Sequence, residues 1–183
     1  EFNIIFENSR GCWLAGGNNV TIANNTIFEN SRWGITASGS LNITGNIISG
    51  NTDVGIYLSS EPLSISYNLI NDIVEYSNED IIPLSFGDIY SVNFNGDSVD
   101  TYNNLFMAPL FSSTNSQNGD FLHLDEESPC IDGGPSGYLD SDSTIRDIGA
   151  YYFNQSNPSV PEANFTSNVV LGSFPLYAQF INT

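Results

Sequence analysis

The first 77 residues alternate short apolar runs with polar residues and glycine at a nearly constant interval. Residues 3–10 (NIIFENSR) recur as residues 25–32 (NTIFENSR), and weaker copies start at Asn46 and Asn68, so the steps are 22, 21 and 22 residues. Inside each step, apolar side chains occupy alternate positions, which is the period of a strand. This repeat is shorter than helical repeats, and it predicts a strand solenoid with three short segments per coil.

Stacked coils place equivalent positions above one another at the ~4.8 Å spacing of hydrogen-bonded strands. We therefore predict apolar columns that run along the solenoid axis and form its core. Neighbouring residues of a strand point to opposite faces, so if Trp13 lies inside, Cys12 faces outward. The predicted columns are Ile5, Ile27, Ile48 and Ile70; Val20, Leu41 and Leu63; Ile22, Ile43 and Ile65; Trp13, Ile35 and Ile56; and Ala15, Ala37 and Leu58.

A second repeating feature is the asparagine that opens each copy of the motif. Asn25, Asn46 and Asn68 are expected at one corner, where asparagine tolerates a left-handed backbone and its amides form a hydrogen-bonded ladder. The predicted fold class is all-β, a right-handed parallel β-helix of about 22-residue coils with an irregular cap, followed by a partial immunoglobulin-like β-sandwich. A leucine-rich-repeat horseshoe is the rival, but the repeat lacks its leucines.

The motif Asn-x-Ile-x-x-Asn followed by Gly-Ile resembles the repeats of pectate-lyase-like and other secreted β-helix proteins. Four later motifs resemble the ending of secreted and surface-anchored microbial β-helix proteins. Two more, 161–165 (PEANF) and 172–180 (GSFPLYAQF), look like the first strands of a PKD-type domain. The four ending motifs are 107–111 (MAPLF), 118–124 (NGDFLHL), 128–134 (SPCIDGG) and 147–151 (DIGAY).

These resemblances divide the chain into four parts: coils at 1–77, an irregular terminal coil and cap at 78–156, a linker at 157–161, and PKD-like strands at 162–183. They imply an extracellular or cell-surface location. The chain opens without methionine or a leader sequence, so we expect it to be part of a longer protein. Residues 73–104 break the repeat, and their aromatic side chains are expected either to cover the core or to form a sugar-stacking platform: Tyr76, Phe86, Tyr90 and Phe94.

Charge narrows the choice of partners. The chain has 21 acidic residues and 3 basic ones, a net charge of −18, and the basic residues are Arg10, Arg32 and Arg146. Nucleic acids and anionic membranes are attracted by basic surfaces, so neither is an expected partner. No run approaches the ~20 apolar residues of a membrane span. The expected partners are cell-surface glycans or copies of the chain itself.

The same alignment stacks Glu7 with Glu29, and Arg10 and Arg32 with Asp53 and Glu75. Paired carboxylates are the acid and nucleophile of glycoside hydrolysis, so Glu7, Glu29, Arg10 and Arg32 are the catalytic candidates if the chain is an enzyme. The candidate ligand-binding column is Arg10, Arg32, Asp53 and Glu75, because guanidinium groups bind carboxylated sugars with two parallel hydrogen bonds. The plainer interpretation is a solvated charged face.

Other candidates are weaker. The spacing of Asp140, Asp142 and Asp147 is similar to that of the carboxylates in a calcium loop, but the segment lacks the glycine and glutamate of such a loop. Ca²⁺ is therefore a possible cofactor, and an ordinary polar turn is the alternative. No other cofactor is expected. His123 and Ser128 have no catalytic partners and are assigned to packing. Cys12 and Cys130 are expected as separate thiols, with an intermolecular bridge as the alternative. Glycosylation motifs occur at Asn19, Asn24, Asn42, Asn154 and Asn164.

The sequence shows no set of residues typical of a catalytic site, so it favours a protein that is not an enzyme. The sequence favours a non-catalytic structural or adhesive protein of a microbial surface or matrix, such as a filament or sheath subunit. A polysaccharide lyase or glycoside hydrolase of the β-helix type is the alternative. A carbohydrate-binding module, which binds without turnover, is the third.

Overall fold

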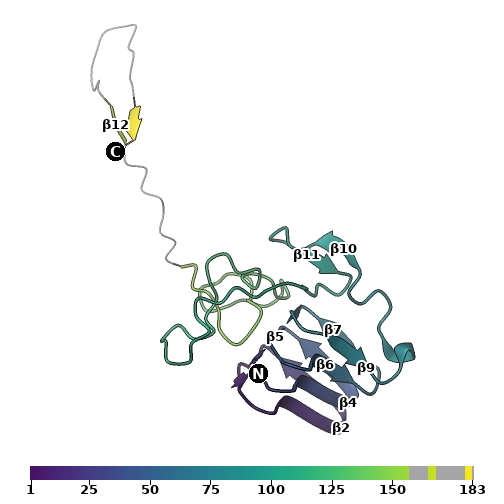
Figure 1. Cartoon of the computed structure of the whole chain (residues 1–183). Coiled ribbons are helices and arrows are strands. Elements are labelled where there is room, and N and C mark those ends of the chain that lie inside the picture. The colour runs from purple at the N-terminus through teal and green to yellow at the C-terminus, as the bar shows by residue number, and fades with distance from the viewer. Residues whose placement is uncertain (157–164, 168–179, 183) are drawn as a thin grey trace.

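The computed structural model describes residues 1–156, 165–167 and 180–182. Apart from one short 3-10 helix, the regular elements in these residues are strands (Figure 1). They are β1 (Ile4–Phe6), β2 (Arg10–Ala23), β3 (Thr26–Phe28), β4 (Trp33–Thr44), β5 (Ile47–Ser49), β6 (Val54–Leu58), β7 (Ser64–Ser66), β8 (Leu69–Ile70), β9 (Val74–Tyr76), η1 (Glu79–Ile81), β10 (Ile89–Val92), β11 (Ser98–Asp100), β12 (Phe165–Ser167) and β13 (Phe180–Asn182).

The first nine strands form two parallel sheets in which successive coils lie side by side. One sheet has the order β1-β3-β5-β8, and the other has β2-β4-β6-β9 with β7 also paired to β4. The predicted parallel β-solenoid is confirmed. β12 and β13 pair antiparallel, and the predicted PKD-like sandwich otherwise lies outside the described residues.

The core runs along the solenoid axis as the alternation predicts, except that Leu63, expected in the column of Val20 and Leu41, is 58% exposed. Ile5, Ile27, Ile48 and Ile70 are in register across four coils, and the last three are almost completely buried. Bulky β-branched side chains stacked directly above one another form one continuous buried cluster. Each fully buried isoleucine contributes about 1.5–3 kcal/mol, so the columns provide much of the folding free energy.

The first coil differs from the predicted register by one residue. Cys12 pairs with Ile35 and packs against the core, whereas Trp13 pairs with Thr36 and is 63% exposed. Leu14, rather than the expected Ala15, continues the column of Ala37 and Leu58. Register shifts between Cys12 and Val20 cause this difference. Cys12 pairs with the residue 23 positions later in the chain, whereas Val20 pairs with the residue 21 positions later.

Asparagine side chains form a buried ladder at one corner. Asn25 Nδ2 donates to Asn46 Oδ1 at 2.9 Å, and Asn46 Nδ2 donates to Asn68 Oδ1 at 3.0 Å. Asn3 extends the ladder at its start, and Asn104 extends it after a 36-residue step. Each amide also accepts a backbone N–H of the preceding coil, so the ladder satisfies groups that a buried turn would otherwise leave unpaired.

A second ladder, which the sequence analysis did not assign, occupies another corner. Asn30 accepts the backbone N–H of Asn8 and donates to Asn51 Oδ1, and Asn51 donates to the carboxylate of Asp72 at 2.7 Å. Asp72 also accepts the backbone N–H of Gly50. A carboxylate has no donor of its own when ionised, so it ends a ladder in which every preceding amide donates forward.

Residues 105–153 pack along the side of the coils as well as beyond the last one. Ring centroids of Phe6 and Phe121 are 4.8 Å apart, and the backbone N–H of Gly149 donates to Gly45. A second buried cluster lies between this cap and the β3-β5-β8 sheet, and Cys130 belongs to it. Cys12 and Cys130 are both free thiols.

The residues that break the repeat form η1 and the antiparallel β10–β11 hairpin. Tyr76 and Phe86 pack against the core, where their rings meet edge to face at 6.3 Å. Tyr90 and Phe94, in contrast, are 69% and 86% exposed. The four candidate platform aromatics are therefore divided between the core and the hairpin.

Candidate functional site

Both tryptophans and two of the three arginines of the chain meet on the outer face of the β2-β4-β6-β9 sheet. The Arg10 guanidinium carbon lies 5.0 Å from the centre of the Trp13 ring and 4.7 Å from that of Trp33. The Arg32 guanidinium lies 4.6 Å from the centre of the same Trp33 ring. Cations at these distances from an indole face are attracted by the ring quadrupole.

Strand register produces this convergence. Arg10 opens β2 and pairs with Trp33, which opens β4, so the two side chains are neighbours across the sheet. Arg32 precedes Trp33 directly in the chain. Tyr57 of β6 stacks on Trp33 with ring centroids 6.5 Å apart, which extends the aromatic row to a third coil. We refer to Arg10, Trp13, Arg32, Trp33 and Tyr57 as the arginine–tryptophan surface.

The two arginines differ in their acidic partners. Arg32 Nε lies 3.4 Å from Asp53 Oδ2, in a pair whose side chains are about half exposed. Arg10 makes no ion pair with an acidic residue in the described part of the chain. The chain has many more acidic than basic residues, yet the Arg10 guanidinium contacts two indole rings and no carboxylate in the described residues. This guanidinium is therefore available to bind an external anion.

The predicted ligand column is thus brought together only in part. Arg10 and Arg32 lie on Trp33 and Asp53 pairs with Arg32, whereas Glu75 lies on the next strand, beside Tyr57 of the same surface. The one-residue shift of the first coil also places Arg10 beside Trp33 rather than above Arg32. The aromatic half of the surface was not predicted. The available signal was that the only two tryptophans each follow an arginine within three residues.

The catalytic candidates occupy equivalent turns. Glu7 and Glu29 follow β1 and β3 with φ values of 53° and 47°, and both side chains are exposed. Within the described residues, neither carboxylate takes part in a side-chain hydrogen bond or an ion pair. The two catalytic candidates therefore lie in equivalent, exposed turns of adjacent coils.

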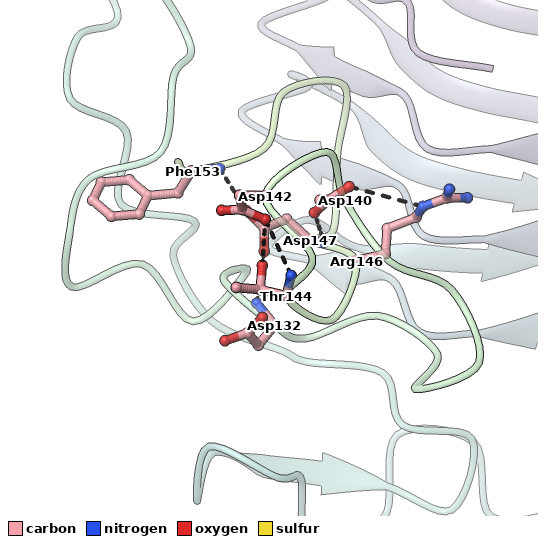
Figure 2. A network of polar contacts seen from close by, with 7 residues as sticks. All are labelled: Asp132, Asp140, Asp142, Thr144, Arg146, Asp147 and Phe153. Atoms are coloured by element: carbon pink, nitrogen blue, oxygen red, sulfur yellow. Dashed lines mark hydrogen bonds and ion pairs between the residues drawn. The ribbon is translucent and has the colours of Figure 1, made fainter. Parts of the chain in front are cut away.

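The cap holds a network of aspartates whose oxygens face backbone N–H groups (Figure 2). Asp147 is almost fully buried and accepts the N–H of Asp132 at 2.7 Å and of Phe153 at 2.6 Å. Asp140 accepts the N–H of Asp147 at 2.7 Å. Burial raises the pKa of Asp147 to about 7 and also raises the pKa of Asp140.

The carboxylates of this network are used as hydrogen-bond acceptors. Asp142 accepts the N–H of Gln155 at 2.7 Å, which lowers the pKa of its carboxyl, and it also binds Thr144. Across the part of the chain that the structure describes, no three His, Cys, Asp or Glu side chains are placed to hold a metal ion. Asp140, Asp142 and Asp147 serve as acceptors that fix the cap backbone.

The remaining candidates are integrated into the cap. His123 stacks on Tyr151 with ring centroids 4.1 Å apart, beside a cleft that is also lined by Asp120 and Tyr152. Ser128 is buried and donates to the carbonyl oxygen of Pro109. Both side chains therefore serve packing and backbone satisfaction.

The glycosylation motifs differ in accessibility. Asn19 and Asn154 are exposed and Asn42 is half-buried, but Asn24 is only 7% exposed, which leaves no room for a glycan on its amide. Asn164 lies outside the described residues.

The geometry defines a parallel β-solenoid with a cationic and aromatic surface on one sheet. A family model described as the right handed beta helix region matches residues 1–106, and the chain belongs to this family. No curated protein and no solved structure matches the chain significantly. Among the helices of the described residues, none has the length and apolar character to cross a membrane. The family contains both enzymes and non-catalytic proteins, so function must be argued from this chain's own surface.

Proposed function

We propose that the chain is a non-catalytic, extracellular adhesive or structural protein of a microbial surface or matrix, and that it holds an acidic glycan on the arginine–tryptophan surface. The observation that carries this proposal is Arg10, a guanidinium without an acidic partner in the described residues, lying on two indole rings. Such a group offers two parallel N–H donors to a carboxylate.

The indole rings supply the second half of saccharide recognition. Trp13 is 63% exposed, and its apolar ring is a surface on which the C–H face of a pyranose packs. Successive coils rise by ~4.8 Å, so Trp33 and Tyr57 continue this row along the solenoid axis. A polysaccharide that lies along the solenoid axis would contact the Arg10 guanidinium and, beside it, the row of aromatic rings.

The extracellular setting rests on the composition and the motifs. An acidic chain with no lysine, a β-helix and an ending similar to those of surface-anchored proteins favour a role outside the cell. The motifs at 161–165 and 172–180 support a PKD-like domain after the cap. Assembly into a filament or sheath belongs to the same proposal.

The test is binding of the whole chain to a panel of polyuronates and neutral glycans, measured by calorimetry. We expect tighter binding to polyuronates than to neutral glycans, because only polyuronates offer a carboxylate to Arg10. Removing a charge-assisted hydrogen bond costs about 1.5–3 kcal/mol, so Arg10→Ala is expected to weaken binding about 10- to 100-fold. Trp13→Ala is expected to weaken it as well, whereas Tyr152→Ala, an exposed aromatic of the cap, serves as the matched control and leaves it unchanged.

The same incubations separate binding from catalysis. New reducing ends or unsaturated sugars that disappear in a Glu29→Gln variant would identify a hydrolase or lyase and contradict the non-catalytic proposal. Equal affinity of the native chain and Arg10→Ala for every glycan would show that this surface is not the binding site.

A further inference from the structure

The β10–β11 hairpin exposes large apolar side chains along its outer strand. Ile89, Tyr90 and Val92 of β10 are 50%, 69% and 62% exposed, and Phe94 in the turn is 86% exposed. Figure 1 shows the hairpin set apart from the stacked coils. Contiguous exposed apolar side chains on a soluble protein mark an interaction surface.

The two strands of the hairpin are anchored differently. Val99 of β11 is completely buried and forms a bridge to Leu105, which also bridges Leu69 of the solenoid. β10 pairs only with β11 among the described strands, so its other edge presents unpaired backbone N–H and C=O groups. A two-stranded hairpin is marginally stable in water, and an open apolar edge of this kind accepts another strand.

Charge indicates which strand fits this edge. Residues 89–96 (IYSVNFNG) carry no charge in a chain of net charge −18, and Asp88 and Asp97 flank them. Two copies repel each other over most of their surface, but an uncharged segment meets its own equivalent without repulsion. The segment also has the β-branched and aromatic composition, without proline, that favours self-pairing.

The flanking aspartates select the direction of pairing. Parallel pairing in register would bring Asp88 of each copy about 5 Å from its equivalent, and such like-charge pairs are destabilising. Antiparallel pairing places the two Asp88 side chains at opposite ends of the strand pair. We therefore propose that β10 binds β10 of a second copy, antiparallel, and forms a four-stranded sheet in the order β11-β10-β10-β11 around a two-fold axis.

The proposed contact uses a face other than the arginine–tryptophan surface and is independent of glycan binding. One strand pair with its side chains is smaller than a standard interface of about 1,200–2,000 Å², so the dimer is expected to be weak and to depend on concentration. Salt strengthens it, because screening reduces repulsion between the two acidic copies.

The test is sedimentation velocity of the whole chain over a concentration series up to about 1 mM, where even a millimolar Kd gives a substantial dimer fraction. The series is run at low salt and at about 1 M salt, where the Debye length is about 3 Å. Val92→Lys places a charge on the open edge, and Leu84→Lys adds the same charge at a position outside β10 that is 87% exposed. Circular dichroism checks that the variants fold, and Ile89→Lys replaces Val92→Lys if that variant does not.

We expect a dimer for the native chain and for Leu84→Lys, stronger at high salt, and loss of the dimer in Val92→Lys. Because lysine lowers the net negative charge, such a loss cannot come from added repulsion between copies. A monomer at every concentration overturns the proposal. So does a dimer that survives Val92→Lys, which would point to another edge such as β2, and so does equal loss in both variants.

Discussion

The buried asparagine ladder leads to a quantitative prediction at Asn46, which is 0% exposed. Its Oδ1 accepts the backbone N–H of Asn25 at 3.0 Å and the Asn25 side-chain amide at 2.9 Å. Its Nδ2 donates to the Ile22 carbonyl at 2.9 Å and to Asn68 Oδ1 at 3.0 Å. Asn46→Ala removes all of these bonds at once in the middle of the solenoid.

The expected loss follows from the groups left behind. Both donors of Asn25 remain buried without an acceptor, and each unsatisfied buried group costs about 1–3 kcal/mol, so the free energy of unfolding should fall by about 4 kcal/mol. Asn8→Ala is the matched control, because Asn8 is exposed and its side chain donates only to the Phe6 carbonyl. Water replaces that bond, and a change within about 0.5 kcal/mol is expected.

Urea denaturation followed by far-ultraviolet circular dichroism measures both variants. With a slope of about 2–3 kcal/mol/M, a loss of 4 kcal/mol lowers the midpoint by about 1.3–2 M. A midpoint for Asn46→Ala within about 0.3 M of that for Asn8→Ala would refute the reasoning, because it would mean that the ladder amides are no more valuable than surface amides.

Three further predictions concern the coil backbone, the cap and the thiols. Gly34→Ala places a Cβ 2.5 Å from a carbonyl oxygen of the next coil and should cost about 1–3 kcal/mol in urea denaturation, whereas Gly137→Ala, with no atom within 4 Å, should change little. The pKa of Asp147 is raised from 3.8 to about 7, so between these pH values the native chain keeps a proton that the unfolded chain loses. The free energy of unfolding should therefore fall as the pH rises from about 4 to 7. In Asp147→Asn, the urea midpoint should depend less on pH over that range. Burial raises the pKa of both thiols, and Cys130 is completely buried whereas Cys12 is only partly buried. Maleimide should therefore label Cys130 only after the chain is unfolded in urea. Rapid labelling of Cys130 in the native chain would contradict its burial.

The solenoid could be predicted because its signal is local and repeated. Alternation over three-residue strands and an asparagine every 21 or 22 residues constrain each coil in the same way, and Ile27 and Ile48 lie where that pattern puts them. The second ladder could also have been predicted from the sequence, since Asn8, Asn30 and Asn51 recur at the same steps. Its final acceptor is Asp72 rather than another asparagine, so the repeat of identical residues stops there.

The candidate site was less predictable because it depends on register. A uniform step of 22 residues places Arg10 above Arg32, whereas register shifts in the first coil move Arg10 beside Trp33. A shift of one residue exchanges the inner and outer faces of a strand, so it decides whether Trp13 is a core residue or part of a binding surface. No count along the sequence resolves a shift of this size.

Contacts between distant segments were likewise decided by tertiary packing. The sequence alone established the all-β solenoid, the column of Ile5, Ile27, Ile48 and Ile70, and the acidic character, because these follow from residue periods and counts. It did not determine that Asn104 continues a ladder after a 36-residue interruption, or that Phe121 packs on Phe6. These contacts join residues far apart in the chain, and they form because the stacked coils present buried acceptors and apolar edges that only the returning cap can reach.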